Sequence, residues 1–278
     1  MKTLFPYAGG KARQAKWIAS FVDIAKHSTY VEPFAGAASV FFAKKPANIE
    51  ILNDTNKLIY YIFKSLRDYP EQFIEYCSLI EYGKESFDEA GQHLDAEDVE
   101  VWKLGAWALF RISAAFSGVP TNVFGWSMKG QNHASTWMNR IKNLSWYVSR
   151  LRHATILNQD GIELIKRVDA DHVLIYADPP YIGGELWYDS VGFDHERLRD
   201  TLVSTKRAKI VLSHYYVEPY VSWYRDWHVV TRESSQSCRG NSEDSDRGNM
   251  KVTEAIFLNF DPEGGVLDEP GPQDAGIV

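Results

Sequence analysis

Four short apolar segments, each followed by or ending in an acidic residue, constrain the fold of this chain more than any other feature. The acids are Glu32, Asp54, Asp160 and Asp178, and the residues before each are the Val, Ile, Leu and Tyr expected of buried strands. A single acid in this position usually caps a helix or lies in a solvated turn. Four of them favour an open α/β sheet, because such sheets bind ligands at the carboxyl ends of their strands.

Strand-like and helix-like patterns alternate along most of the chain, which predicts a parallel sheet with helices on both faces. Strands are expected near 29–34, 49–53, 154–159, 172–177, 208–213, 228–232 and 252–260. Helices are expected near 12–25, 37–45, 161–168, 194–205 and 217–226. Residues 56–153 interrupt this alternation with helical patterns alone, near 56–68, 70–81, 97–116 and 136–152.

The strand at 172–177 is followed by Asp178-Pro179-Pro180-Tyr181, which suits methylation of a planar, weakly nucleophilic amine. The Asp178 carboxylate can accept one N–H of such an amine, and the Pro179 carbonyl can accept the other. The prolines fix φ and make the turn rigid, and the Tyr181 ring can stack on a base turned out of a duplex. Because Asp-Pro-Pro also ends ordinary strands, this interpretation depends on the rest of the chain.

The segment 30–39 combines a strand, a turn of small residues around Gly36 and the start of a helix. Such a turn brings backbone amides and a helix N-terminus to a ligand, although the full G-x-G-x-x-G pattern is missing. Asp54 follows 18 positions after Gly36, close to where an acid accepts ribose hydroxyls in dinucleotide folds. The pattern therefore favours a nucleoside-containing ligand at this edge.

The chain resembles the Dam-type, class D12 DNA adenine-N6 methyltransferases over most of residues 3–260. Four motifs of that family occur here in the family's order: Tyr7-Ala8-Gly9-Gly10-Lys11, Glu32-Pro33-Phe34-Ala35-Gly36, Leu52-Asn53-Asp54-Thr55-Asn56 and Asp178-Pro179-Pro180-Tyr181. Two positions depart from the family's pattern. Tyr7 stands where Trp is usual, and Gly161 stands after Asp160 where Phe is common, so a stacking surface and the adenine pocket differ.

The resemblance implies a Rossmann-like, S-adenosylmethionine-dependent methyltransferase sheet with an antiparallel final strand. Residues 1–55 and 154–260 would form the catalytic core, and residues 56–153 an inserted, mostly helical target-recognition subdomain. Residues 261–278 are expected to form a disordered acidic tail. The implied activity is transfer of a methyl group to the N6 amine of a flipped-out adenine in duplex DNA.

The resemblance also implies a role for each motif residue. The target adenine would be held by the tetrapeptide residues Asp178, Pro179, Pro180 and Tyr181. S-adenosylmethionine would contact Asp178 and a set from the N-terminal segment and the strand ends: Tyr7, Gly9, Gly10, Lys11, Glu32, Pro33, Phe34, Gly36, Asp54 and Asp160. Ser213 and His214 end a later strand at the same edge, and are candidates either for the base pocket or for a structural role.

A net charge of −7 argues against nucleic-acid binding until the charges are located along the chain. Residues 68–100 hold eleven acids and one base, whereas residues 111–153 hold six Arg or Lys, no acid, and interleaved aromatics. The basic stretch favours phosphate contact with base stacking; the alternative is an amphipathic helix with aromatic core positions. DNA contacts are predicted for Arg111, Asn122, Lys129, Gln131, Arg140 and Lys142, with the loop 118–132 reading base edges.

The two cysteines fit neither a disulfide framework nor a thiolate zinc site, and they indicate a reducing compartment. Neither follows a proline, which argues against carbon-5 cytosine methylation. No apolar run is long enough for a signal peptide or a membrane span. We therefore expect a cytoplasmic protein of prokaryotic or viral origin that uses S-adenosylmethionine and duplex DNA, needs no metal or membrane, and is a monomer or weak dimer.

Three alternatives stay open. Cytosine-N4 methylation uses the same chemistry, although Asp at the start of the tetrapeptide favours adenine. Protein-glutamine methylation uses a related motif that usually begins with Asn, in a family without the helical insertion. A DNA-binding module without catalysis is the third, and the intact tetrapeptide argues against it. The recognition sequence and the presence of a partner restriction endonuclease are also left open.

Overall fold

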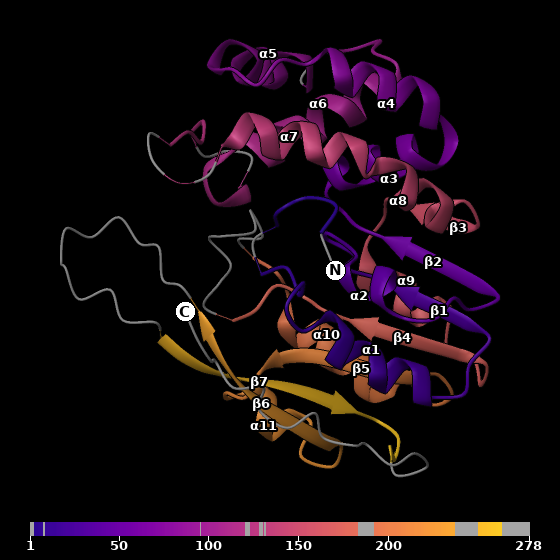
Figure 1. Ribbon diagram of the computed structural model, residues 1–278. Helices are drawn as coiled ribbons and strands as arrows, with labels where there is room; N and C mark the ends of the chain where they lie inside the picture. The colour runs from indigo at the N-terminus through magenta and orange to yellow at the C-terminus, as the bar shows by residue number, and fades with distance from the viewer. Residues whose placement is uncertain are drawn as a thin grey trace.

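Seven strands form one sheet in the computed structural model, which describes residues 3–7, 9–94, 96–119, 123–127, 130, 132–182, 192–236 and 250–262. The sheet has the order β3-β2-β1-β4-β5-β7-β6, and among these strands β7 alone runs opposite to the other six (Figure 1). The strands are β1 (Thr29–Glu32), β2 (Ile49–Asn53), β3 (Ala154–Leu157), β4 (Val173–Ala177), β5 (Lys209–Tyr215), β6 (His228–Gln236) and β7 (Met250–Leu258). Each overlaps its predicted range, and the antiparallel final strand is confirmed.

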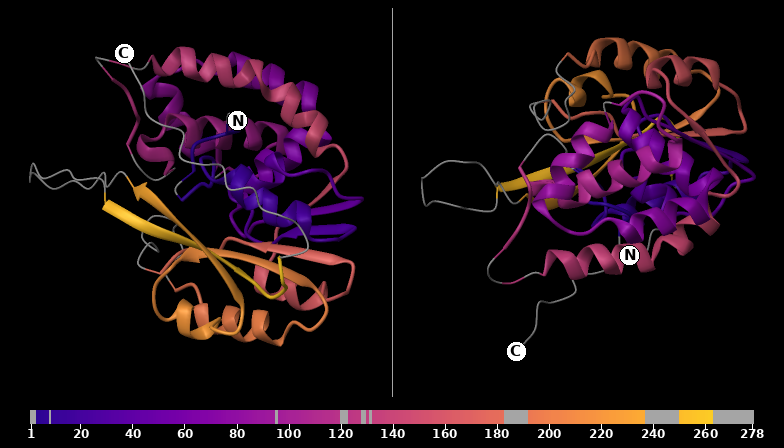
Figure 2. Two further views of the ribbon diagram at one scale, coloured as in Figure 1. Left: turned by 60° about the horizontal axis from the view of Figure 1, so that its bottom comes forward. Right: turned by 90° about the horizontal axis from the view of Figure 1, so that it is seen from above.

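The central strands are buried on both faces, as expected of a parallel sheet between two layers of helices. In β4, Leu174 and Tyr176 face one apolar cluster, whereas Ile175 faces another. The first cluster includes α1 (Ala15–Ile24) and α2 (Ser39–Ala43), and the second includes α9 (Gly161–Arg167), α10 (His195–Ser204) and α11 (Tyr220–Trp223). Figure 2 shows helices on opposite sides of the sheet. The predicted Rossmann-like α/β fold is confirmed.

Between β2 and β3 the described chain is helical, as predicted. The helices are α3 (Lys57–Asp68), α4 (Pro70–Leu79), α5 (Lys84–Leu94), α6 (Val101–Ala114), the short η1 (Phe116–Gly118), α7 (His133–Lys142) and α8 (Leu144–Leu151). They gather at the β2–β3 side of the molecule (Figure 1), with α6 packed against α3, α4, α5 and α7. Their apolar side chains belong to the first apolar cluster, the one that Leu174 and Tyr176 of β4 also contact. Because that core is continuous, the division at residues 56 and 153 stays a prediction.

Two helices in this group differ from the prediction. Helix α5 was not expected, because its buried face consists of Phe87 and Ala90 among charged and small residues. The single helix predicted for 136–152 is divided at Asn143, which ends α7 and precedes α8. Helix α7 also begins earlier than predicted, because the Asn132 side chain accepts a hydrogen bond from the Ser135 amide at 2.9 Å.

No helix among the described residues is long and apolar enough to cross a membrane. The acidic tail predicted for 261–278 lies outside the described residues from position 263 onward.

Candidate active site

A cleft of about 690 Å³ opens at the carboxyl ends of β1, β2 and β4, beside the start of α9. Of the residues predicted to bind the cofactor, the cleft is lined by Tyr7, Gly9, Gly10, Lys11, Glu32, Phe34, Gly36, Asp54, Asp160 and Asp178. Pro33 is the one predicted contact that does not line it; its carbonyl accepts a hydrogen bond from the Asn53 side chain at 2.9 Å. Segments far apart in the sequence therefore meet at one edge of the sheet.

The turn between β1 and α2 requires a glycine at position 36. Gly36 has a φ of +47°, and a Cβ atom there would lie 2.9 Å from the Tyr7 ring. Only glycine combines this backbone conformation with such a close approach. The Gly36 amide donates to Asp54 Oδ2 at 2.8 Å, so the turn is tied to the end of β2. Tyr7 and Gly36 thereby form one wall of the cleft.

Asp54 lines the cleft and accepts hydrogen bonds from two backbone amides. Its Oδ2 accepts from Gly36, and its Oδ1 accepts from the Asn56 amide at 2.9 Å. Burial raises the pKa of Asp54, while the two amides act in the opposite direction. Each carboxylate oxygen has two lone pairs, so Asp54 can still accept hydroxyl hydrogen bonds from a ligand.

Asp160 caps α9 and carries an ion pair that the sequence did not reveal. Its Oδ1 accepts from the Ile162 and Glu163 amides, and its Oδ2 lies 2.8 Å from Arg197 Nη1. Burial raises the pKa of Asp160, but Arg197 and the two amides outweigh it and lower the pKa overall. Arg197 also lines the cleft, so a cation lies beside this acid.

Gly161 has a packing reason to depart from the family's pattern. A Cβ at this position would lie 2.6 Å from the Phe34 ring and 2.7 Å from the Pro33 carbonyl oxygen. Any larger residue would therefore push against the β1 turn. The Phe34 ring also packs edge-on against Phe193, with 5.6 Å between the ring centroids. Phe34 thus lies against the backbone at the start of α9, where the larger residue would have to fit.

Asp178 is held by two side chains from other parts of the chain. Lys11 Nζ lies 2.9 Å from Asp178 Oδ1, and Ser213 Oγ donates to the same oxygen at 2.7 Å. Lys11 also donates to the Gly9 carbonyl at 2.9 Å and lies 4.2 Å from the centre of the Tyr181 ring. Lys11 therefore joins the N-terminal motif to the tetrapeptide.

Tyr181 does not present the open ring expected of a base-stacking platform. Its side chain is 3% exposed, with Lys11 over the ring and the His214 ring centroid 4.4 Å away. The Tyr215 ring packs edge-on against the Tyr181 ring, and the Tyr181 hydroxyl donates to Glu254 Oε2 at 3.3 Å. A base could stack on Tyr181 only after these side chains moved, so the structure does not support the predicted stacking in this conformation.

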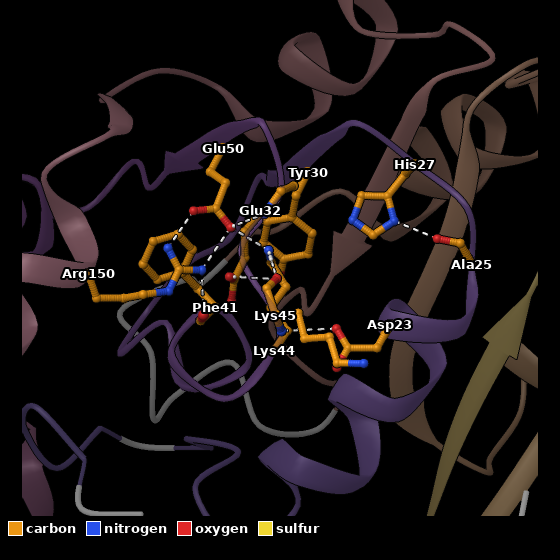
Figure 3. Close-up of polar contacts among 11 residues, drawn as sticks. Asp23, Ala25, His27, Tyr30, Glu32, Phe41, Lys44, Lys45, Glu50 and Arg150 are labelled. Atoms are coloured by element: carbon orange, nitrogen blue, oxygen red, sulfur yellow. Dashed lines mark hydrogen bonds and ion pairs between the residues drawn. The ribbon is translucent and has the colours of Figure 1, made fainter.

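Glu32 is a buried acid that lines the cleft, and Figure 3 shows it beside Tyr30. It accepts a hydrogen bond from the Tyr30 hydroxyl at 3.0 Å. Burial raises the pKa of Glu32 to about 8, against the effect of that hydrogen bond. The side chain is therefore mostly protonated at neutral pH and can itself donate a hydrogen bond.

The residues expected to contact DNA divide into three groups. Arg111 donates to the Phe87 carbonyl at 2.6 Å and stacks on the Phe87 ring, and Arg140 donates to the Leu4 carbonyl. Burial lowers the pKa of Arg140 to about 10. These contacts correct the prediction, because they direct both guanidinium groups into the protein's own packing. Lys142 is exposed, and Asn122, Lys129 and Gln131 lie outside the described residues.

The other members of the basic stretch also differ from one another. Arg150 forms a buried ion pair with Glu50, which contacts Lys44 as well (Figure 3). Trp137 and Tyr147 are core residues, as in the alternative interpretation of this segment. Three apolar side chains of the described residues 115–119 and 123–127 are exposed instead: Phe116 at 43%, Val123 at 73% and Trp126 at 68%. Gly118 and Val119, from the same segment, line the cleft.

Comparison with known proteins finds similarity to several methyltransferases. A Type II methyltransferase, M1.LlaDCHI of Lactococcus lactis subsp. cremoris, is 25% identical over 91% of this chain and 94% of its own length. A putative methylase, HI0767 of Haemophilus influenzae, matches 92% of each chain at 11% identity with a TM-score of 0.37. The putative methyltransferase yhhF of Escherichia coli matches 90% of this chain and 86% of its own at 11% identity and a TM-score of 0.38.

The family assignment depends on sequence rather than on these weak structural matches. The family model of the D12 class N6 adenine-specific DNA methyltransferases matches residues 7–237. That range includes the N-terminal Tyr-Ala-Gly-Gly-Lys motif, the β1 turn, the end of β2 and the tetrapeptide after β4. The chain therefore belongs to the D12 class of N6 adenine-specific DNA methyltransferases.

Proposed function

We propose that the cleft binds S-adenosylmethionine together with one adenine turned out of duplex DNA, and that Asp178 holds the N6 amine of that adenine. Family membership makes adenine in DNA the target of methylation. One observation carries the assignment to this cleft. The carboxylates of Asp54 and Asp178 and the turn at Gly36 line the same cavity, although they come from three separate strand ends.

The lining residues suit a nucleoside-containing cofactor. A volume of about 690 Å³ lies within the usual range for small-molecule sites. Asp54 offers acceptor lone pairs to ribose hydroxyls, and the tight turn at Gly36 lets a ligand approach the backbone closely. Asp160, Phe34 and Ile162 form the side of the cleft at the start of α9, which we assign to the cofactor's adenine.

The chain's own residues activate the amine. S-adenosylmethionine, when bound, supplies a methyl group that forms a bond to the target nitrogen while its bond to sulfur breaks and leaves a thioether. Asp178 and the Pro179 carbonyl accept the two N–H groups, which frees the nitrogen lone pair from the ring. Asp178 then takes the proton that the methylated nitrogen releases. Positioning and electrostatics supply most of the rate enhancement in such a site.

The described residues 115–119 and 123–127 are the proposed DNA-facing edge of the cleft. They border the cavity at Gly118 and Val119, and they expose the large apolar side chains of Val123 and Trp126. Apolar side chains of this kind fill the gap that a flipped base leaves in a duplex or wedge between base steps. Lys142, exposed at the end of α7, is the proposed phosphate contact.

The likeness to a Type II methyltransferase leads us to propose a defined DNA sequence as the substrate, within a restriction–modification setting in the cytoplasm. The test is to incubate the purified protein with duplex DNA and methyl-labelled S-adenosylmethionine, and then to analyse the nucleosides. We expect the label in N6-methyl-2′-deoxyadenosine. Label in N4-methylcytosine, or none in DNA, would contradict the proposal.

A further inference from the structure

Two neighbouring residues of β5 hold the two ends of the tetrapeptide loop. Ser213 and His214 are almost completely buried, and adjacent residues of a strand point to opposite faces of the sheet. Ser213 Oγ donates to Asp178 Oδ1 at 2.7 Å. On the other side, His214 Nε2 accepts from the Ile182 amide at 3.2 Å. The loop therefore crosses the end of β5 with one contact on each face.

The contact at His214 fixes the far end of the loop. His214 Nδ1 lies 3.1 Å from the Tyr215 carbonyl, so the tautomer with hydrogen on Nδ1 satisfies both ring nitrogens. Its ring stacks on Tyr220 with 3.6 Å between centroids and 10° between planes. Burial lowers the pKa of His214 to about 3, which keeps this ring neutral. The backbone after Tyr181 is therefore anchored independently of Asp178.

The contact at Ser213 is part of a buried chain of hydroxyl groups. Tyr176 OH and Ser213 Oγ are 3.1 Å apart, and both side chains are buried. The Ser213 hydroxyl has one proton, which it donates in the hydrogen bond to the Asp178 carboxylate. Ser213 must therefore accept the hydrogen bond from Tyr176. Burial raises the pKa of Tyr176 well above its usual value, so the phenol keeps the proton that it donates. The direction of donation is therefore from Tyr176 to Ser213 to Asp178.

The two oxygens of Asp178 differ as a result. Oδ1 contacts both Lys11 Nζ at 2.9 Å and Ser213 Oγ at 2.7 Å. Within the described part of the chain, Oδ2 has no hydrogen-bond partner, while the Asp178 side chain is 19% exposed and lines the cleft. A carboxylate held through one oxygen has a defined plane, so the other oxygen has a defined direction.

We propose that Ser213 is a positioning residue for methyl transfer: together with Lys11 it holds Asp178 through Oδ1, so that Oδ2 is the oxygen that accepts the N–H of the target amine. This inference rests on the proposed role of Asp178. It adds a residue outside the four sequence motifs, and it assigns separate tasks to the two carboxylate oxygens. Tyr176, which also lines the cleft, precedes Ser213 in the chain of hydrogen bonds and keeps the Ser213 proton directed at Asp178.

The test compares Ser213→Ala with Ser213→Thr, which keeps a hydroxyl. The matched control is Ser65→Ala, which removes another buried hydroxyl with one hydrogen bond, to the Val101 carbonyl at 2.8 Å. We expect Ser213→Ala to lower kcat roughly 10- to 100-fold, the effect of losing a hydrogen bond to a charged group that acts in the transition state. The Kd for S-adenosylmethionine should stay unchanged. Ser213→Thr should recover most of the rate, and Ser65→Ala should keep the wild-type kcat.

A double-mutant cycle separates this inference from the proposed function. If Ser213 acts through Asp178, Ser213→Ala should cause no further loss of rate in an Asp178→Ala background. Additive losses, or a wild-type kcat in Ser213→Ala while Asp178→Ala is inactive, would overturn the role of Ser213 alone. Wild-type activity in Asp178→Ala would instead overturn the proposed role of Asp178.

Tyr176→Phe keeps the inference testable if Ser213→Ala fails to fold. This variant leaves Ser213 in place and removes only the donor behind it. A severalfold loss of kcat is expected. An unchanged kcat would contradict the relay from Tyr176 through Ser213 to Asp178.

Discussion

Individual side chains in the cleft have structural partners as well as proposed ligands, and Asp54 is the clearest case. Its two oxygens hold the amides of Gly36 and Asn56, so the carboxylate shapes the β1 turn before any ligand binds. A substitution there should therefore affect both direct hydrogen bonds to the cofactor and the position of the turn.

Asp54→Ala should weaken the binding of S-adenosylmethionine by on the order of 1.5–3 kcal/mol, the usual contribution of hydrogen bonds to a charged group. Isothermal titration calorimetry measures this change directly. Asp226→Ala is the control, because Asp226 is an exposed acid with an ion-pair distance of 3.8 Å to Arg225. If Asp54→Ala binds the cofactor as tightly as the wild type, the ribose contact lies elsewhere.

Glu32 should make the folded state less stable as the pH rises. Burial raises its folded-state pKa from 4.5 to about 8, so the folded protein binds one more proton than the unfolded chain between these values. Stability from this group is therefore fully present below about pH 4.5 and declines by up to about 1.4 kcal/mol per pH unit until about pH 8.

Glu32→Gln tests this dependence, because Gln does not ionise. Chemical unfolding of both proteins at pH 6 and pH 8 gives the difference in the free energy of unfolding. We expect the wild type to lose stability relative to Glu32→Gln between these two values. Taking the difference removes the contributions of His27 and His214, whose pKa values burial lowers in both proteins alike. A difference that stays constant with pH would show that Glu32 is ionised throughout.

At the scale of elements, α7 shows how one helix divides charged side chains between structure and surface. Arg140 turns toward the N-terminal segment and donates to the Leu4 carbonyl, whereas Lys142, two positions later, is exposed. A helix turns by about 100° per residue, so side chains two positions apart point in different directions. The charge pattern of the segment therefore does not by itself identify the DNA-facing side.

Arg140 and Lys142 should consequently respond differently to replacement by alanine. Arg140→Ala should lower the free energy of unfolding by about 1–3 kcal/mol, because the Leu4 carbonyl loses its donor. Lys142→Ala should leave stability unchanged and reduce the log–log salt slope of DNA binding by about 0.9, the value for one phosphate contact. Denaturant titrations and DNA binding at several salt concentrations measure the two effects. The reverse assignment of effects would place Arg140 rather than Lys142 on the DNA.

For the whole molecule, sequence patterns predicted local structure well and long-range pairing poorly. The strand ends with acids at Glu32, Asp54 and Asp178 could be predicted, because apolar periodicity and short motifs are local properties of the sequence. The pairing of Asp160 with Arg197 could not, because 37 positions separate them and many other cations were equally available. Helix α5 was missed for a different reason, since only Phe87 and Ala90 mark its buried face.

The orientation of side chains was the other property that the sequence did not contain. Arg150 and Tyr181 are correctly located in a helix and after a strand, yet both are directed into the core. Their direction depends on Glu50 and on His214, which reach them from other strands. Composition and spacing describe which residues are near an edge, whereas packing decides which of them face the cleft.

The central claim is that this cleft methylates adenine with Asp178 as the acceptor for the target amine. Its most direct test is the single-turnover rate of methyl transfer to duplex DNA by the wild type and by Asp178→Ala, with cofactor affinity measured on both. We predict N6-methyl-2′-deoxyadenosine from the wild type. The variant should still fold and bind S-adenosylmethionine, but its rate should be at least tenfold lower, which raises the activation free energy by about 1.4 kcal/mol or more. A variant that transfers methyl groups at close to the wild-type rate would contradict this assignment.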